Sequence, residues 1–237
     1  MAGELIGIVG ESGVGKSTAI LGNPELGIIG LPPKETFIIS VAGKGLPTKG
    51  WKQHYKPFHP TESPDGNWFS SDKAANIKNA LNRINTTMPH IKYIVLDDVH
   101  YSMAFGFMRK AMEKGYEKFN ELGKDYFEII DMARNLRDDL QVYFICHSEE
   151  IHKDFEVVRK MKTLGNMLDS KITLEGLFNI VLYAASEWDD KAQKGNYFFI
   201  TNRTNDYPAK SPQGTFPSIR IPNDLGYVAK CVNEYYN

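Results

Sequence analysis

The stretch Gly10-Glu11-Ser12-Gly13-Val14-Gly15-Lys16-Ser17 decides the fold, because it matches the pattern G-x-x-x-x-G-K-[ST] of a phosphate-binding loop. The apolar run Leu5–Val9 before it predicts a buried strand. Lys16–Leu21 predicts a helix, which Gly22, Asn23 and Pro24 end early. Such a loop wraps its backbone amides around phosphate, and the helix adds its positive N-terminal end. The alternative is a glycine-rich turn with an incidental lysine.

Each part of this loop has an expected role with ATP and Mg²⁺. Lys16 is a catalytic candidate because it would reach the β- and γ-phosphates, and the Ser17 hydroxyl would bind Mg²⁺. The expected nucleotide-binding residues are Gly10, Glu11, Ser12, Gly13, Val14, Gly15, Lys16, Ser17 and Thr18.

A second motif, Tyr93-Ile94-Val95-Leu96-Asp97-Asp98, is an apolar strand that ends in two carboxylates. Enzymes with a phosphate loop need an acid at the end of a neighbouring strand to hold Mg²⁺ through water, and we assign Asp97 to that role. Asp98 points elsewhere and is a catalytic candidate, as the general base that orients the attacking water. The alternative is that Asp98 caps the helix that follows.

A further strand is predicted at Val142–Cys146, and it ends in His147 and Ser148. A polar side chain at the tip of a strand beside the nucleotide can sense the γ-phosphate, so His147 is a third catalytic candidate. The alternative is a histidine that is partly exposed where the strand reaches solvent. Glu149 and Glu150 are alternative bases.

The rest of the chain continues to alternate strands with helices. Further strands are expected at Thr36–Val41, Phe178–Ala184 and Tyr197–Thr201, and helices at Asp72–Ile84, Tyr101–Phe119 and Asp125–Leu136. The segments without a clear period are Ala42–Asp72, Ser148–Glu175 and Pro208–Pro222. This alternation implies right-handed βαβ units. We therefore predict an α/β fold with a mainly parallel sheet flanked by helices, extended at one edge by a C-terminal β-hairpin.

Size and composition favour one globular domain over residues 1–237. The chain is 42% hydrophobic and 24% charged, with a net charge of −1. That charge gives no overall attraction to nucleic acid or membranes, so any site for a polyanion must be local. The two cysteines form no disulfide framework, and the chain has no signal peptide or membrane-spanning run. These features predict a cytoplasmic protein without a membrane partner.

Two stretches are candidates for binding single-stranded nucleic acid, which basic grooves and stacking aromatic rings hold. Lys44–His59 carries four lysines and no acid, with Trp51, Tyr55 and Phe58 between them. The alternative is a solvated loop whose aromatic rings fix it to the core. Lys153–Lys171 has five basic residues against three acidic ones, and its alternative is a solvated charged loop.

The motifs GESGVGKST, TFIISVAGKGLP, GWKQHY, YIVLDDVHY and VYFICHSEE together resemble the RecA-like core of bacteriophage ATP-binding proteins, the recombination ATPases that promote annealing of single-stranded DNA. The segment KMKTLGNMLDSKITLEGLFNIVLY, a hairpin and NDYPAKSPQGTF extend the resemblance over nearly the whole chain. The resemblance implies a RecA-like P-loop NTPase core that hydrolyses ATP and binds single-stranded DNA. It also implies a homo-oligomeric ring or filament in the host bacterial cytoplasm, with a single-strand-binding protein as a further partner.

One departure from the RecA pattern concerns the catalytic base. RecA has a glutamate at the end of its second strand, whereas Ser40-Val41-Ala42-Gly43 contains no acid, which indicates weak hydrolysis and favours Asp98 as the base. The resemblance also implies that Ser148–Glu175 contacts DNA and that Lys210 or Arg203 enters a neighbouring subunit's site. The alternatives are another P-loop NTPase, such as a packaging motor or small-molecule kinase, and a non-catalytic module that assembles on ATP.

Overall fold

The computed structural model of the chain describes residues 3–153, 156–164 and 172–236. The strands are β1 (Glu4–Gly10), β2 (Thr36–Ser40), β3 (Trp68–Ser70), β4 (Tyr93–Asp97), β5 (Gln141–Lys153), β6 (Glu156–Met161), β7 (Ile180–Asp189), β8 (Lys194–Ile200) and β9 (Arg220–Pro222). The α-helices are α1 (Trp51–His54), α2 (Ala74–Thr87), α3 (Tyr101–Arg109), α4 (Glu117–Arg134) and α6 (Leu225–Tyr236). Short 3₁₀ helices are η1 (Pro24–Leu26), η2 (Pro33–Glu35) and η3 (Leu174–Leu177). None of the helices in this described part of the chain is long and apolar enough to span a bilayer.

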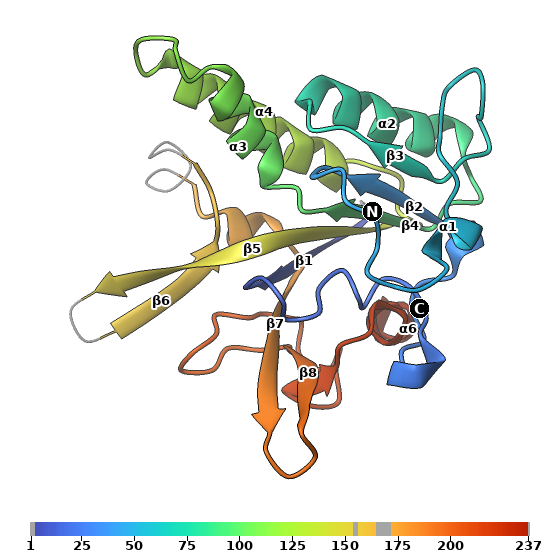
Figure 1. Cartoon of the computed structure of the whole chain (residues 1–237), viewed down its shortest axis with the longest axis vertical. Coiled ribbons are helices and arrows are strands. Elements are labelled where there is room, and N and C mark those ends of the chain that lie inside the picture. Colours follow the sequence, from blue (N-terminus) through green and yellow to red (C-terminus); the bar gives the residue numbers. More distant parts are fainter. Residues whose placement is uncertain (1–2, 154–155, 165–171, 237) are drawn as a thin grey trace.

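The strands form one mixed sheet in the order β3-β2-β4-β5-β1-β7-β8-β9, with β6 paired to β5 (Figure 1). The strands from β3 to β7 in that order run parallel. The pairs β7–β8, β8–β9 and β5–β6 are antiparallel. The predicted α/β class, with a mainly parallel sheet and a C-terminal hairpin, is therefore confirmed. The hairpin of β7 and β8 is not the outer edge, because β9 continues the sheet beyond it.

Two hydrophobic cores lie on opposite faces of the sheet. Alternate side chains of β1 separate between them, since Leu5 and Val9 belong to one core and Ile6 and Ile8 to the other. Helices α2, α3 and α4 cover the first face, whereas α6 and the chain between β1 and β2 cover the second (Figure 1). Because both faces are covered, the central strands are nearly continuous apolar runs, as parallel sheets require.

The strand order separates the phosphate loop from the acidic strand. β1 pairs with β5, which in turn pairs with β4, so β5 lies between them. The sequence left this strand order open, and the acidic strand β4 is one strand removed from β1. His147 pairs with Gly10 in the parallel register, which places it at the same end of the sheet as the loop.

The helix expected at Lys16–Leu21 is wrong, because this segment forms only one turn. The amide of Ala19 donates to the carbonyl of Gly15 at 3.1 Å, and that of Ile20 to Ser17 at 3.4 Å. The chain then doubles back through paired bonds between Asn23 and Ile28, at 2.8 and 3.0 Å. The phosphate loop is consequently not followed by a long helix whose positive end could bind phosphate. The backbone amides of the loop remain as donors.

The single helix expected at Tyr101–Phe119 is also wrong. The helix α3 ends at Arg109, and α4 begins at Glu117 and includes most of the helix expected from Asp125. Between them Gly115 has φ +92°, a conformation that breaks a helix. Part of the predicted apolar stripe is therefore not buried, since Met112 is 95% exposed.

Three segments expected to lack regular structure contribute to the sheet. The β5 strand continues six residues past His147 and pairs with β6, so Ser148–Glu175 begins as a hairpin. Within Ala42–Asp72, α1 forms and β3 pairs with β2. The tail includes β9, and α6 follows it, although the sequence predicted no helix there.

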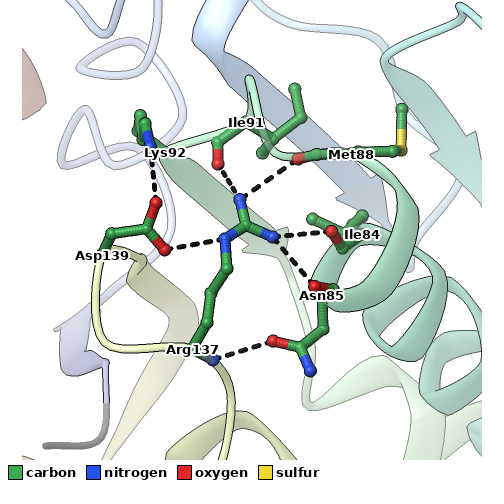
Figure 2. A network of polar contacts seen from close by, with 7 residues as sticks. All are labelled: Ile84, Asn85, Met88, Ile91, Lys92, Arg137 and Asp139. Atoms are coloured by element: carbon green, nitrogen blue, oxygen red, sulfur yellow. Dashed lines mark hydrogen bonds and ion pairs between the residues drawn. The ribbon is translucent and has the colours of Figure 1, made fainter.

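A polar network around Arg137 joins α2 to the start of β4 (Figure 2). The guanidinium donates to the carbonyls of Ile84 at 2.7 Å and Met88 at 3.1 Å, and also to that of Ile91. These carbonyls lie at the end of α2 and in the turn that leads to β4, and those of Ile84 and Met88 also accept the amides of Met88 and Ile91. Its Nε bonds to Asp139 at 2.7 Å, and the Arg137 amide to the side chain of Asn85 at 2.8 Å. The network lies at the end of the sheet opposite the phosphate loop.

Candidate functional site

The phosphate loop leaves the carboxyl end of β1 in a shape that requires glycine. Gly13 and Gly15 both have φ +85°, where side chains with a Cβ are strained. At Gly10 an added Cβ would lie 2.6 Å from the carbonyl oxygen of Ala184 on β7. The glycines therefore allow a tight loop beside the neighbouring strand. Val14 instead packs against the core on the α6 side, and its carbonyl accepts a bond from Asn223 at 3.0 Å.

The side chain of Lys16 is buried across its own loop. Its Nζ donates to the carbonyls of Gly10 at 2.8 Å and Glu11 at 2.6 Å. Burial lowers the pKa of Lys16, although Cys146, Asp98 and Asp97 oppose that effect. The two bonds use two of its three N–H donors, so the ammonium group can still donate to a phosphate oxygen.

Ser17 and Asp97 form the pair expected to hold a metal ion. The Ser17 hydroxyl donates to Oδ1 of Asp97 at 3.0 Å across the tip of β5. Burial and the neighbouring Asp98 together raise the pKa of Asp97 to about 6, although the Ser17 bond opposes them. A buried carboxylate beside a hydroxyl fits Mg²⁺, which takes oxygen ligands and usually needs one or two carboxylates besides the phosphates. Across residues 3–153, 156–164 and 172–236, no group of three or more Asp, Glu, His or Cys side chains could hold a metal ion. Phosphate oxygens would therefore have to complete the ligands of the ion.

Asp98 lies between two positively charged or ionisable side chains. Its Oδ2 is 2.5 Å from Nζ of Lys44, and its Oδ1 is 3.5 Å from Nε2 of His147. Burial favours a higher pKa for Asp98, but the bonds with His147 and Lys44 outweigh it and hold the pKa below its usual range. The carboxylate is therefore ionised at neutral pH. Asp98 has a left-handed backbone, with φ +58°, directly after the end of β4.

His100 is a buried neighbour of the site that the sequence did not reveal. Its ring packs edge-on against His147, with 4.7 Å between the centroids. Burial and the nearby His147 together lower the pKa of His100 to about 3, so the ring is neutral at physiological pH. The neutral ring of His100 therefore packs against His147 and helps to hold it in position.

A cavity of about 890 Å³ opens above the phosphate loop. Of the predicted site residues, it is lined by Ser12, Gly13, Gly15, Lys16, Ser17, Thr18, Asp98 and His147. The other predicted residues, Gly10, Glu11, Val14 and Asp97, lie outside this lining. The lining also includes Asn196, Tyr197 and Asn223, and Leu26 and Ile28 from the chain after the loop.

The sequence model of a known family, described as AAA domain, matches residues 3–213. The chain belongs to the AAA domain family. Membership indicates a P-loop ATPase of the AAA type and implies nucleotide binding, typically with Mg²⁺. No curated protein matches the chain.

The first candidate DNA-binding stretch of this AAA domain does not present free aromatic rings. Tyr55 and Phe58 are buried, and Trp51 packs against Trp68 with 4.5 Å between the ring centroids. The alternative, in which aromatic rings fix the loop to the core, describes this stretch better. Lys44, at its start, lines the cavity instead.

The second stretch is partly neutralised by its own hairpin. Nη2 of Arg159 lies 2.5 Å from Oε1 of Glu150, and Nζ of Lys160 lies 3.0 Å from Oε1 of Glu149. Glu149 and Glu150, the alternative bases, thus form ion pairs with β6 and not with residues of the phosphate loop. Lys171 lies outside the described residues.

The residues proposed to act on a neighbouring subunit lie on the C-terminal part of the AAA domain. Lys210 forms an isolated backbone bridge with Val181 near the start of β7, and burial lowers the pKa of Lys210. Arg203 is exposed.

Sequence reasoning missed several residues that shape the cavity. The ring of Tyr197 lies against the phosphate loop, since a Cβ at Gly15 would be 3.2 Å from its Cδ1. Asp224 accepts bonds from the amides of Ile29 at 2.7 Å and Gly30 at 2.9 Å, which fixes the chain next to Ile28 in the cavity lining. These contacts join residues about 180 or more positions apart, so no local signal pointed to them.

Proposed function

We propose that this AAA domain binds Mg-ATP at residues 10–18 and hydrolyses it. The observation that carries the proposal is the bond of 3.0 Å between Ser17 and Asp97 beside the buried Lys16. It brings the phosphate loop and the acidic strand together although β5 separates β1 from β4. The cavity above them has room for a nucleotide, since ligand sites commonly measure about 300–1,000 Å³.

Each residue has a role that follows from its position. The loop amides and Lys16 bind the phosphate oxygens, and Ser17 and Asp97 hold the metal ion. Mg²⁺, when bound, neutralises charge that develops on those oxygens. Asp98 stays ionised and orients water as a hydrogen-bond acceptor, which its low pKa suits better than removing a proton. His147 lies 3.5 Å from Asp98 and senses the occupied site.

The direct test is Lys16→Ala, measured as Mg-ATP binding by calorimetry and as phosphate release. Loss of a charged contact to phosphate should weaken binding by roughly tenfold or more. Lys49→Ala is the matched control, because Lys49 is exposed and lies outside the cavity lining. Wild-type protein that binds neither ATP nor GTP at millimolar concentration with Mg²⁺ would exclude the proposal. For Asp98→Asn, an unchanged turnover at saturating ATP would remove Asp98 from its role.

The finer proposal is a RecA-like core, one domain over residues 1–237, that oligomerises on single-stranded DNA and promotes annealing or recombination. It is supported by the resemblance of its motifs to phage recombination ATPases. A second support is Trp188 near the tip of the β7–β8 hairpin, which is 62% exposed and free to stack on a base. The hairpin begins at β7, next to the phosphate-loop strand β1.

The test of the finer proposal is fluorescence anisotropy of a labelled oligonucleotide with ATP and Mg²⁺ over a salt series. Trp188→Ala should weaken binding several-fold, since stacking contributes about 1–3 kcal/mol for each base. Tyr235→Ala, which removes an exposed ring on α6, is the control. An absence of oligonucleotide binding at low salt would favour the other P-loop alternatives, and stimulation of phosphate release by a small-molecule acceptor would favour a kinase.

A further inference from the structure

Lys44 brings a second ammonium group into the cavity that contains Lys16. It follows β2, whose last residue, Ser40, pairs with Asp97 in the parallel register. The loops that follow β2 and β4 therefore lie at the same end of the sheet. Lys44 and Lys16 both line the cavity above the phosphate loop.

The backbone that carries Lys44 is fixed in place. The Ser40 hydroxyl donates to the Lys44 carbonyl at 2.9 Å, and the Val41 amide donates to the Asp97 carbonyl at 3.0 Å. Between them Gly43 adopts φ +70°, which allows the tight turn. The position of Lys44 is thus determined by the same strand end that holds the acidic pair.

The side chain of Lys44 is anchored but remains accessible. Its Nζ lies 2.5 Å from Oδ2 of the buried Asp98 and 5.8 Å from the centroid of the Tyr101 ring. Even so, 62% of the side chain is exposed, whereas only 5% of the Asp98 side chain is. An ammonium group has three donors, so Lys44 can keep its bond with Asp98 and donate another to a ligand.

Two ammonium groups in one cavity repel each other unless an anion lies between them. Asp98 is one such anion, and a triphosphate, with its larger negative charge, would satisfy both lysines. Lys16 bonds to the carbonyls at the start of the loop, whereas Lys44 approaches from the acidic-strand side. Because Asp98 is proposed to orient the attacking water, the phosphate nearest to it is the terminal one, which that water attacks.

We propose that Lys44, positioned by Asp98, binds the terminal phosphate of the nucleoside triphosphate and makes the protein discriminate ATP from ADP. This inference rests on the proposed nucleotide function and adds a residue to the same site.

The test is calorimetric titration of the full chain with Mg-ATP and with Mg-ADP. Lys44→Met removes the charge while keeping the chain length, and it should weaken ATP binding by roughly tenfold or more, with ADP binding within about twofold of wild type. Retained ADP binding also demonstrates that the variant is folded. Lys44→Arg keeps a cation and should restore most of the preference for ATP. Lys49→Met, five residues further on, should bind both nucleotides like the wild type.

Two outcomes would overturn the inference. An unchanged affinity of Lys44→Met for ATP would show that the ammonium group does not touch the nucleotide. An equal loss for ATP and ADP would place Lys44 away from the terminal phosphate. Both differ from a failure of the proposed function, in which the wild type itself binds neither nucleotide.

Discussion

Replacing Asp97 by asparagine should stabilise the nucleotide-free protein while impairing its response to Mg-ATP. The carboxyl group is fully buried beside Asp98, and its partner is the Ser17 hydroxyl. Burial and the neighbouring Asp98 disfavour the charged form more than Ser17, Lys44 and Lys16 favour it, which is why the pKa rises to about 6 from 3.8. Asparagine has nearly the same shape, carries no charge and can still accept the Ser17 bond.

The magnitude follows from the difference between the two pKa values. At about 1.4 kcal/mol for each pH unit, ionising Asp97 in the native state costs about 3 kcal/mol at pH 8. The folded pKa lies above the unfolded one, so the native state holds its proton more tightly and stability falls as pH rises from about 4 to about 6. At pH 5 the cost should be about half as large. Removing it should raise the melting temperature at pH 8 by roughly 6–12 °C.

The assay is thermal unfolding of the wild type and Asp97→Asn at pH 5 and pH 8, with and without Mg-ATP. Mg-ATP should raise the wild-type melting temperature, since ligand at 100 times its Kd adds about 2.7 kcal/mol. The variant should respond much less, because it lacks the carboxylate that holds the metal. Asp190→Asn is the matched control, since Asp190 is exposed on the hairpin, and it should change neither property.

Two results would refute this reasoning. If Asp97→Asn is less stable than the wild type at pH 8, the carboxylate is satisfied by contacts other than a metal ion. If the stability difference is the same at pH 5 and pH 8, it does not arise from ionisation of Asp97.

Two further predictions concern the end of the sheet opposite the phosphate loop and the side of the cavity lined by Tyr197. Arg137→Ala should lower the free energy of unfolding, measured in urea, by about 3 kcal/mol, because several bonds to carbonyls are lost at about 1 kcal/mol each. The control is Arg134→Ala at the surface of α4, which should lower it by less than about 0.5 kcal/mol. An equal effect of the two substitutions would contradict the role of the network in Figure 2. Tyr197→Ala should weaken ATP binding about fivefold but leave tripolyphosphate binding unchanged, because the half-exposed ring beside Gly15 would contact the nucleoside and not the phosphates. Tyr197→Phe keeps the ring and should resemble the wild type. Equal losses for both ligands would instead mean that Tyr197 supports the loop itself.

The central strands could be predicted from sequence because burial on both faces gives a direct local signal. β1, β2 and β4 coincide with apolar runs to within one or two residues. β5 was recognised only over its buried half, since beyond His147 it leaves the core and its residues become polar. The same limit explains β3, whose three residues are only partly buried or exposed.

Helix ends were predicted less well because an apolar period does not show where a chain turns. The spacing of Met108, Met112 and Tyr116 continues a helical stripe, yet α3 ends at Arg109 and Gly115 turns the chain before α4. These three side chains are 68%, 95% and 85% exposed. The turn after the phosphate loop is short for a different reason. Gly22 is packed so closely that an added Cβ would lie 2.5 Å from the carbonyl oxygen of Ile29, a contact with a later part of the chain.

The sequence by itself determined the phosphate loop, the acidic strand end and the alternating pattern that makes an α/β sheet, because each is a contiguous run of residue types whose chemistry is local. Only the tertiary structure decided that β5 separates the two motifs, that Lys44 enters the cavity while Tyr55 and Phe58 are buried, and that Tyr197 lies against Gly15. These arrangements depend on strand order and on packing between distant segments. The neighbours of a residue along the chain do not specify them.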